Sequence, residues 1–258
     1  MFDLSYNISD MIWFLLILVR VATIIFVMPV FGAKFLPSQW KIGFAVILAV
    51  LLSMVIHPLE QNARLATAGG LMLGVGSEVM IGLVLGLTTG FIFYSVMLWG
   101  QLIGAQMGLG LANIVDPTAG GDISVVSQFY YMFAIVIFLS IDGHHMLING
   151  MLDSYDYFPA GAMTFPFKSL RSFIELSGSI FTVAVQLAAS MIVLLLLVST
   201  ILGVIARTVP QMNIFIVGFP LKLFVGLLGL VLSVPYITKA LIDLFRRIPV
   251  DLAAVLGS

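Results

Sequence analysis

Two uncharged stretches of this sequence are each much longer than one straight membrane span. Residues 79–115 and 176–206 contain no Asp, Glu, Lys or Arg. A spanning helix needs about 20 apolar residues, with a range of about 17–25. The sequence therefore predicts apolar helices that do not divide into a row of equal spans. Four further uncharged runs are shorter: 21–33, 42–56, 123–141 and 223–238.

The composition agrees with a membrane location. Of the 258 residues, 61% are hydrophobic and 9% are charged, whereas an average soluble domain is about 45–50% apolar and about 25% charged. A soluble fold of this size could not cover that apolar excess with polar groups. The composition argues against a soluble enzyme or a secreted toxin, and the net charge of −1 argues against a nucleic-acid partner.

The N-terminus and the residue types set further limits. With no cysteine, disulfides, iron–sulfur clusters and thiolate zinc sites are excluded. Asp3 and Asp10 stand where a secretory signal would carry Lys or Arg, and the apolar run 11–33 is too long for such a signal. We therefore expect a retained membrane segment and a protein that contacts membrane lipid.

Prolines punctuate the apolar runs, and each is expected to kink or end a helix. The predicted fold class is all-α, with membrane-associated helical hairpins, several of them broken or re-entrant. The positive-inside rule does not fit six conventional spans, because Lys34 and Lys41 would then lie opposite the C-terminal Lys239, Arg246 and Arg247. Either one segment does not cross, or the protein is not a conventional bundle. The prolines in question are Pro29, Pro37, Pro58, Pro210, Pro220 and Pro235.

More than half of the 24 glycines lie between residues 69 and 121. Small residues four apart form a flat stripe on a helix, which lets another backbone approach closely. This stripe has two interpretations: tight packing within the chain, or contact with a helix of a partner protein. The predicted helix-packing stripe consists of Gly82, Gly86, Gly90, Gly100, Gly104 and Gly108.

A turn signal follows this glycine-rich helix. The segment LGLANIVDPTAGGD, residues 109–122, contains Asp-Pro and then Gly-Gly, so the helix is expected to break here. Irregular backbone survives at membrane depth only when it is buried in protein or lines a watery cavity. The alternatives are an exposed loop and a re-entrant loop, and the apolar residues of the segment favour the second.

Ionisable residues within apolar sequence are candidates for function. Four stand out: Arg20, Glu78, Arg207 and Lys222. A structural role is the alternative, with Arg20 paired to Glu78, and with Arg207 and Lys222 reaching the membrane interface.

No motif predicts catalysis, a cofactor or a metal. The nucleotide-binding glycine motifs, HExxH and GxSxG are absent. The run Asp142-Gly143-His144-His145 is the strongest candidate for a metal site, but adjacent helical side chains point about 100° apart. The two imidazoles are therefore expected to cap a helix and not to chelate one ion.

Several strings together resemble the flagellar biosynthesis protein FliR family. They are RVATIIFVMPVFGAKFLP, GQLIGAQMGLGLANIVDPTAGGDISVVSQF, FLSIDGHHMLI and ARTVPQMNIFIVGFPLKL, in that order from about Arg20 to Lys222. The VDPTAGG and VSQF motifs resemble the flagellar branch of the family more than the virulence-secretion branch.

The resemblance implies a core pore subunit of the flagellar type III protein export gate. Such a subunit assembles with FliP and FliQ, works with FlhB and FlhA, and passes unfolded flagellar proteins across the bacterial inner membrane at the basal body. It implies one export-gate domain, 1–258, with a FliP-like part over about 1–175 and a FliQ-like hairpin and tail over about 176–258. A plug loop is implied over 104–122, formed by Met107, Leu109, Leu111, Asn113, Ile114, Val115, Asp116, Pro117, Gly120 and Gly121.

A small-solute secondary transporter is the alternative function, because broken helices and embedded charges suit one. That alternative predicts an inverted repeat, which a comparison of 1–128 with 129–258 does not reveal. An intramembrane enzyme is less favoured, because no embedded nucleophile and base form a pair.

Overall fold

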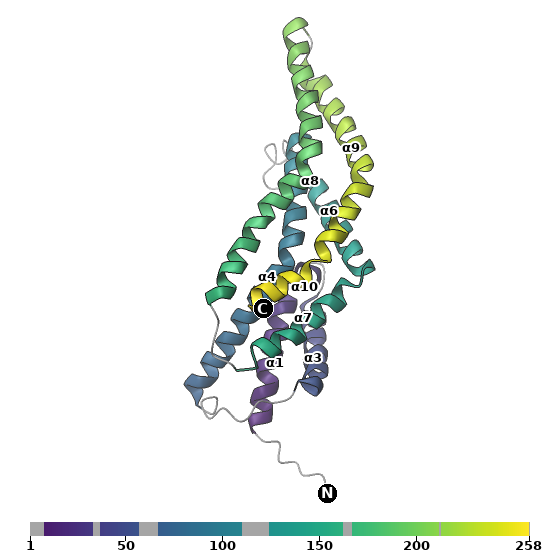
Figure 1. Ribbon diagram of the computed structural model, residues 1–258. Coiled ribbons are helices and arrows are strands. Elements are labelled where there is room, and N and C mark those ends of the chain that lie inside the picture. The colour runs from purple at the N-terminus through teal and green to yellow at the C-terminus, as the bar shows by residue number, and fades with distance from the viewer. Residues whose placement is uncertain are drawn as a thin grey trace. The chain divides into compact units, whose positions relative to one another are not determined.

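The computed structural model describes residues 8–32, 37–56, 67–109, 124–161, 167–211 and 213–257, and in these ranges the regular secondary structure is entirely helical (Figure 1). The all-α prediction is therefore confirmed. The helices are α1 (Ile8–Val27), α2 (Pro29–Gly32), α3 (Ser38–Val55), α4 (Ala68–Gln106), α6 (Val125–Ser140), α7 (Gly143–Tyr157), α8 (Phe167–Thr208), α9 (Ile214–Phe245) and α10 (Ile248–Leu256).

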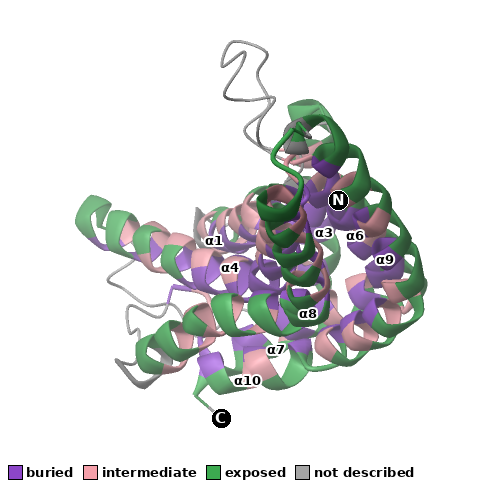
Figure 2. Ribbon diagram, turned by 90° about the horizontal axis from the view of Figure 1, so that it is seen from above, coloured by how far each residue is buried: buried purple, intermediate pink, exposed green. Residues whose placement is uncertain are grey.

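Five apolar segments are long enough to cross a membrane, and a sixth span results if the bent pair α6 and α7 counts as one. The segment Ala68–Gln106 differs from the others, since 72% of its most apolar window is buried, against 22–33% in the other four. Figure 2 shows the same contrast, with α4 largely buried and α8 and α9 widely exposed. Much of the apolar surface on α8 and α9 is thus available to lipid or to other proteins.

The helices form two compact units that are interleaved along the chain. The first contains residues 1–91, 142–177 and 246–258, and the second contains 92–141 and 178–245. The division of the sequence into FliP-like and FliQ-like parts near residue 175 stays a prediction.

In the first unit, α1 packs along α3 and buries one continuous face. Leu16, Arg20 and Ile24 follow one another at intervals of four and are all fully buried. Residues four apart lie on the same side of a helix, so the sequence itself places the Arg20 side chain in the interior. In the same unit α7 packs on α10, where the side chain of Leu252 covers Gly150.

Aromatic rings form the interior of the second unit. Phe93, Phe138 and Phe245 contact one another with ring centroids 5.1–5.6 Å apart. The rings of Trp99 and Tyr130 lie 4.1 Å apart, and the Tyr130 hydroxyl donates to the Leu230 carbonyl at 3.2 Å. These contacts join α4, α6 and α9 within the unit.

The prolines follow the expectation only in part. α1 ends just before Pro29, Pro37 precedes α3, and Pro210 follows the end of α8. Pro220 and Pro235, however, lie inside α9, so neither ends its helix, and a kink at these positions stays a prediction. Figure 1 shows α9 as one curved helix. Apolar helices tolerate interior prolines where neighbouring groups and local adjustments satisfy the freed carbonyl. Pro58 lies outside the described residues.

Candidate functional site

Arg20 and Glu78 form a buried ion pair in the first unit. The Arg20 Nε donates to Glu78 Oε2 at 2.5 Å, and both side chains are fully buried. Arg20 comes from the buried face of α1, and Glu78 from the first third of α4. The structure therefore contains the Arg20–Glu78 pair that the sequence analysis gave as the structural alternative.

Main-chain groups complete this pair, which we call the Arg20 clamp. One guanidinium nitrogen donates to the carbonyl and hydroxyl oxygens of Ser154, at 3.2 and 3.0 Å, and the other donates to the Phe158 carbonyl at 2.7 Å. The guanidinium carbon lies 3.9 Å from the centre of the Tyr155 ring. The remaining oxygen of Glu78 accepts from the Gly161 amide at 2.8 Å.

The clamp is suited to holding helices together and not to catalysis. A buried charge is tolerated when its partners satisfy its hydrogen-bonding capacity, and here donors and acceptors from α1, α4 and the end of α7 meet. Sequence reasoning missed Ser154, Phe158 and Gly161, because two of them contribute only backbone groups. No residue type marks such a position in a sequence.

Arg207 and Lys222 lie apart from this clamp. Arg207 is exposed in the last turn of α8, and Lys222 is half-buried on α9. Neither makes an ion pair with another residue that the structure describes. A cation near a helix C-terminus is favoured by the helix dipole, which accounts for Arg207 without a further role.

The glycine stripe faces helices of its own chain. A Cβ on Gly82 would lie 2.8 Å from the Thr23 Cβ, and one on Gly86 would lie 3.2 Å from the Val27 Cβ, so both glycines pack on α1. In the second unit Gly100 and Gly104 face α6 at Ser127 and just before it at Ser124. At these four positions the interpretation as contact with a partner helix is wrong, because the chain itself fills the space. Gly90 is also buried.

α4 ends with a defined cap at Gly108. Gly108 has φ 84°, and its amide donates to the Ala105 carbonyl, while the Leu109 amide donates to the Gly104 carbonyl, both at 3.0 Å. These two hydrogen bonds and the left-handed glycine constitute a Schellman motif. The predicted helix break is thus confirmed, and the glycine requires its conformational freedom here.

Of the predicted plug residues, two are described. Met107 is buried, and its side chain would contact a Cβ placed on Gly226 of α9; Leu109 is half-buried. The other eight lie in 110–123, outside the described residues, so the plug stays a prediction: Leu111, Asn113, Ile114, Val115, Asp116, Pro117, Gly120 and Gly121.

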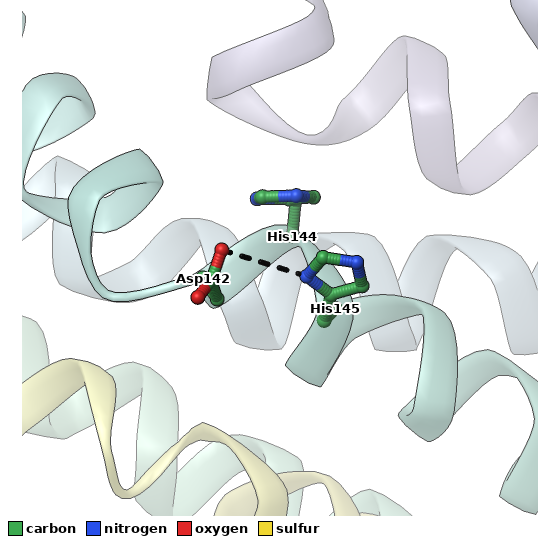
Figure 3. Close-up of side chains that lie close together, drawn as sticks. All are labelled: Asp142, His144 and His145. Atoms are coloured by element: carbon green, nitrogen blue, oxygen red, sulfur yellow. Dashed lines mark ion pairs between the residues drawn. The ribbon is translucent and has the colours of Figure 1, made fainter.

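The structure brings together three polar side chains at the start of α7. Ligand atoms of Asp142, His144 and His145 all lie within 4.8 Å of one another (Figure 3). The centroids of the two imidazole rings are only 4.2 Å apart. The rings of these two consecutive residues are therefore in contact.

The described helices define an all-α membrane protein with one buried ion pair whose hydrogen-bonding groups have partners. Comparison with known proteins identifies the family within this class. A family model described as "Bacterial export proteins, family 1" matches residues 11–248. The chain belongs to this family. The resemblance based on sequence motifs is thereby confirmed.

Relatives match over nearly their whole length. The flagellar biosynthetic protein FliR of Bacillus subtilis is 34% identical, with 90% of each chain covered. The protein of the same name from Pectobacterium carotovorum is 34% identical over 95% of this chain and 94% of its own. That of Escherichia coli is 31% identical over 90% and 87%.

Proposed function

We propose that this chain is a core pore subunit of the flagellar type III protein export gate. In this role it assembles with FliP and FliQ, works with FlhB and FlhA, and passes unfolded flagellar proteins across the bacterial inner membrane at the flagellar basal body. It acts as a passage and not as an enzyme.

One observation carries the proposal: relatives named as flagellar biosynthetic protein FliR match almost end to end. The alignments cover 90% or more of both chains, so the similarity is not confined to one segment. Family membership supports export as the general role, since the matching model describes bacterial export proteins.

The surface of the chain supports assembly with other apolar proteins. Exposed side chains on α9 include Val231 and Leu232, whose exposures are 70% and 71%, and Phe224 with 66%. On α3, Trp40 and Met54 are 75% and 76% exposed. Such faces suit protein interfaces as well as lipid contact.

Affinity purification from native membranes tests the proposal. The tagged chain, extracted in mild detergent from the bacterium that encodes it, is expected to carry FliP and FliQ in fixed ratios, identified by mass spectrometry. A strain without the gene should lose motility and stop exporting flagellar proteins, and plasmid expression of the chain should restore both.

Two outcomes would contradict the proposal. One is a monodisperse protein without partners that transports a small solute after reconstitution, which would favour a secondary transporter. The other is normal flagellar export in the strain without the gene. A matched control is a second membrane protein with the same tag, which should not retain FliP or FliQ.

A further inference from the structure

Asp142, His144 and His145 lie where α6 has ended and α7 begins. Asp142 is the one non-glycine residue with positive φ among those described, at φ 57° and ψ 32°. Its carbonyl accepts from the His145 amide at 2.9 Å, which closes the first turn of α7. This backbone conformation turns the chain abruptly, and the two histidines follow within the first turn.

The side chains are close enough to share one ion. The His145 Nδ1 lies 3.6 Å from Asp142 Oδ1, and the ligand atoms of all three residues lie within 4.8 Å of one another (Figure 3). Ligand atoms around a tetrahedral zinc ion, with bonds of about 2.0–2.1 Å, are roughly 3.3 Å apart. The ligand atoms must therefore move closer together, and the 67% exposure of His145 and 75% exposure of Asp142 leave these side chains room to rotate.

Few existing interactions compete for these groups. The Asp142 side chain makes no capping hydrogen bond to α7. The His144 Nδ1 is buried and has no hydrogen-bond partner among the described residues. Most buried polar atoms in proteins have a partner, so this nitrogen is free to bind a ligand as far as the described residues are concerned.

The ligand set indicates which ions fit. Two imidazoles and one carboxylate are typical of Zn²⁺ and of Co²⁺ or Ni²⁺, whereas Mg²⁺ and Ca²⁺ prefer oxygen ligands throughout. The positive end of the α7 dipole opposes a cation, and the Asp142 carboxylate offsets it. Three protein ligands leave the fourth tetrahedral position open.

We propose that Asp142, His144 and His145 form a binding site for one divalent transition-metal ion of the Zn²⁺ type, with its fourth coordination position open to water or to another molecule. The proposal concerns this chain alone and does not depend on the proposed role in export.

Binding of Co²⁺ and Zn²⁺ to the full chain tests this site. The protein is purified in detergent with its affinity tag removed, so that no added histidines contribute. We expect one Co²⁺ per chain with the intense visible absorption of tetrahedral coordination, displaced by one equivalent of Zn²⁺. Isothermal titration calorimetry gives the Zn²⁺ dissociation constant.

Substitutions locate the ion. His145→Ala and Asp142→Asn should each weaken Zn²⁺ binding at least tenfold, and both residues are exposed, so the fold should survive. The matched controls are His57→Ala, the one histidine outside the cluster, and Asp153→Asn, an exposed aspartate of the same helix. Both controls should bind like the wild type.

Three results would overturn the proposal. One is the absence of Zn²⁺ and Co²⁺ binding by a wild-type protein whose circular dichroism shows folded helices. Another is unchanged affinity in the double variant His144→Ala/His145→Ala. A third is an equal loss in His57→Ala, which would place the ion elsewhere.

Discussion

Arg20 shows how one charged residue is accommodated within an apolar helix. Its guanidinium makes four hydrogen bonds, one of them to Glu78, and stacks on Tyr155. Replacing a whole buried pair by apolar residues is often neutral, whereas removing one partner leaves an unpaired buried charge. Removing only one partner of the Arg20 clamp should therefore destabilise the fold more than removing both.

We predict that Arg20→Met or Glu78→Leu alone lowers the free energy of unfolding by about 3–5 kcal/mol. The double variant Arg20→Met/Glu78→Leu should be less destabilised than the sum of the two single variants, because no unpaired charge remains. Unfolding by SDS titration of the protein in mixed micelles, followed by circular dichroism, measures all three.

A second ion pair in the same chain provides a control for these three variants. Arg171 and Glu175 form an ion pair at 2.9 Å, but their side chains are 85% and 65% exposed. Exposed pairs contribute about 0.2–1 kcal/mol, so Arg171→Met should have little effect. A loss for Arg20→Met no larger than that for Arg171→Met would contradict the structural role of the clamp.

At the scale of the element, α4 combines close packing with open positions along one helix. Gly82 and Gly100 touch neighbouring backbone, whereas a Cβ on Gly69 or Gly76 would meet nothing within 4 Å. The spacing of the glycines in the sequence did not separate the closely packed positions from the open ones. The packed positions are set by neighbours that are distant in sequence, Thr23 and Ser127.

We predict that Gly82→Ala and Gly100→Ala destabilise the protein by about 1–3 kcal/mol, the usual effect of overpacking. Gly76→Ala should instead be neutral or stabilise by up to about 1 kcal/mol, since alanine is the better helix former. SDS unfolding of each variant gives the comparison. Equal effects at all three positions would show that contact with α1 and α6 is not what requires glycine.

The segment that begins with Leu109, the last residue of the Schellman motif, allows a prediction about the proposed plug. Deletion of residues 109–121 should make membranes that contain the assembled gate leak ions and small solutes, because nothing would then fill the closed pore. Release of a trapped fluorescent dye from inverted vesicles measures the leak. Equal retention by vesicles with wild-type and deleted gates, at equal gate content, would exclude the plug assignment.

How far the sequence predicts these elements depends on the kind of contact. The Arg20–Glu78 pair was predictable, because few ionisable residues lie in apolar sequence and each needs a partner. The break after Gly108 was also predictable from local turn chemistry. The continuity of α9 through Pro220 and Pro235 was not, because it depends on groups from other parts of the structure. Nor was the contact between the His144 and His145 rings, whose centroids are 4.2 Å apart, because it depends on the rotamers of two neighbouring side chains.

At the scale of the whole molecule, a substitution on an exposed apolar face can test whether lipid or another protein covers that face. Leu232 of α9 is 71% exposed, so a larger apolar side chain there meets lipid or detergent in the isolated chain and should change its stability by no more than about 0.5 kcal/mol. If a partner covers this face, the added volume overpacks the interface and weakens assembly.

We therefore predict that Leu232→Trp leaves SDS unfolding of the isolated chain nearly unchanged but sharply reduces co-purification of FliP and FliQ. Leu232→Ala is the matched control and should retain both partners. Undiminished recovery of partners with Leu232→Trp would assign this face of α9 to lipid.

The Arg20 clamp also has a consequence for synthesis of the protein. Arg20 is made early, but its acceptors lie at Glu78, Ser154 and Phe158, so more than half of the chain must be translated before the charge is satisfied. An arginine near the centre of a lone spanning helix costs about 2.5–3.5 kcal/mol on insertion scales. Until α7 has been made, α1 therefore carries a penalty that its many apolar residues must outweigh. The penalty is relieved only when the later acceptors arrive, which couples the final placement of the first helix in the membrane to the folding of α7.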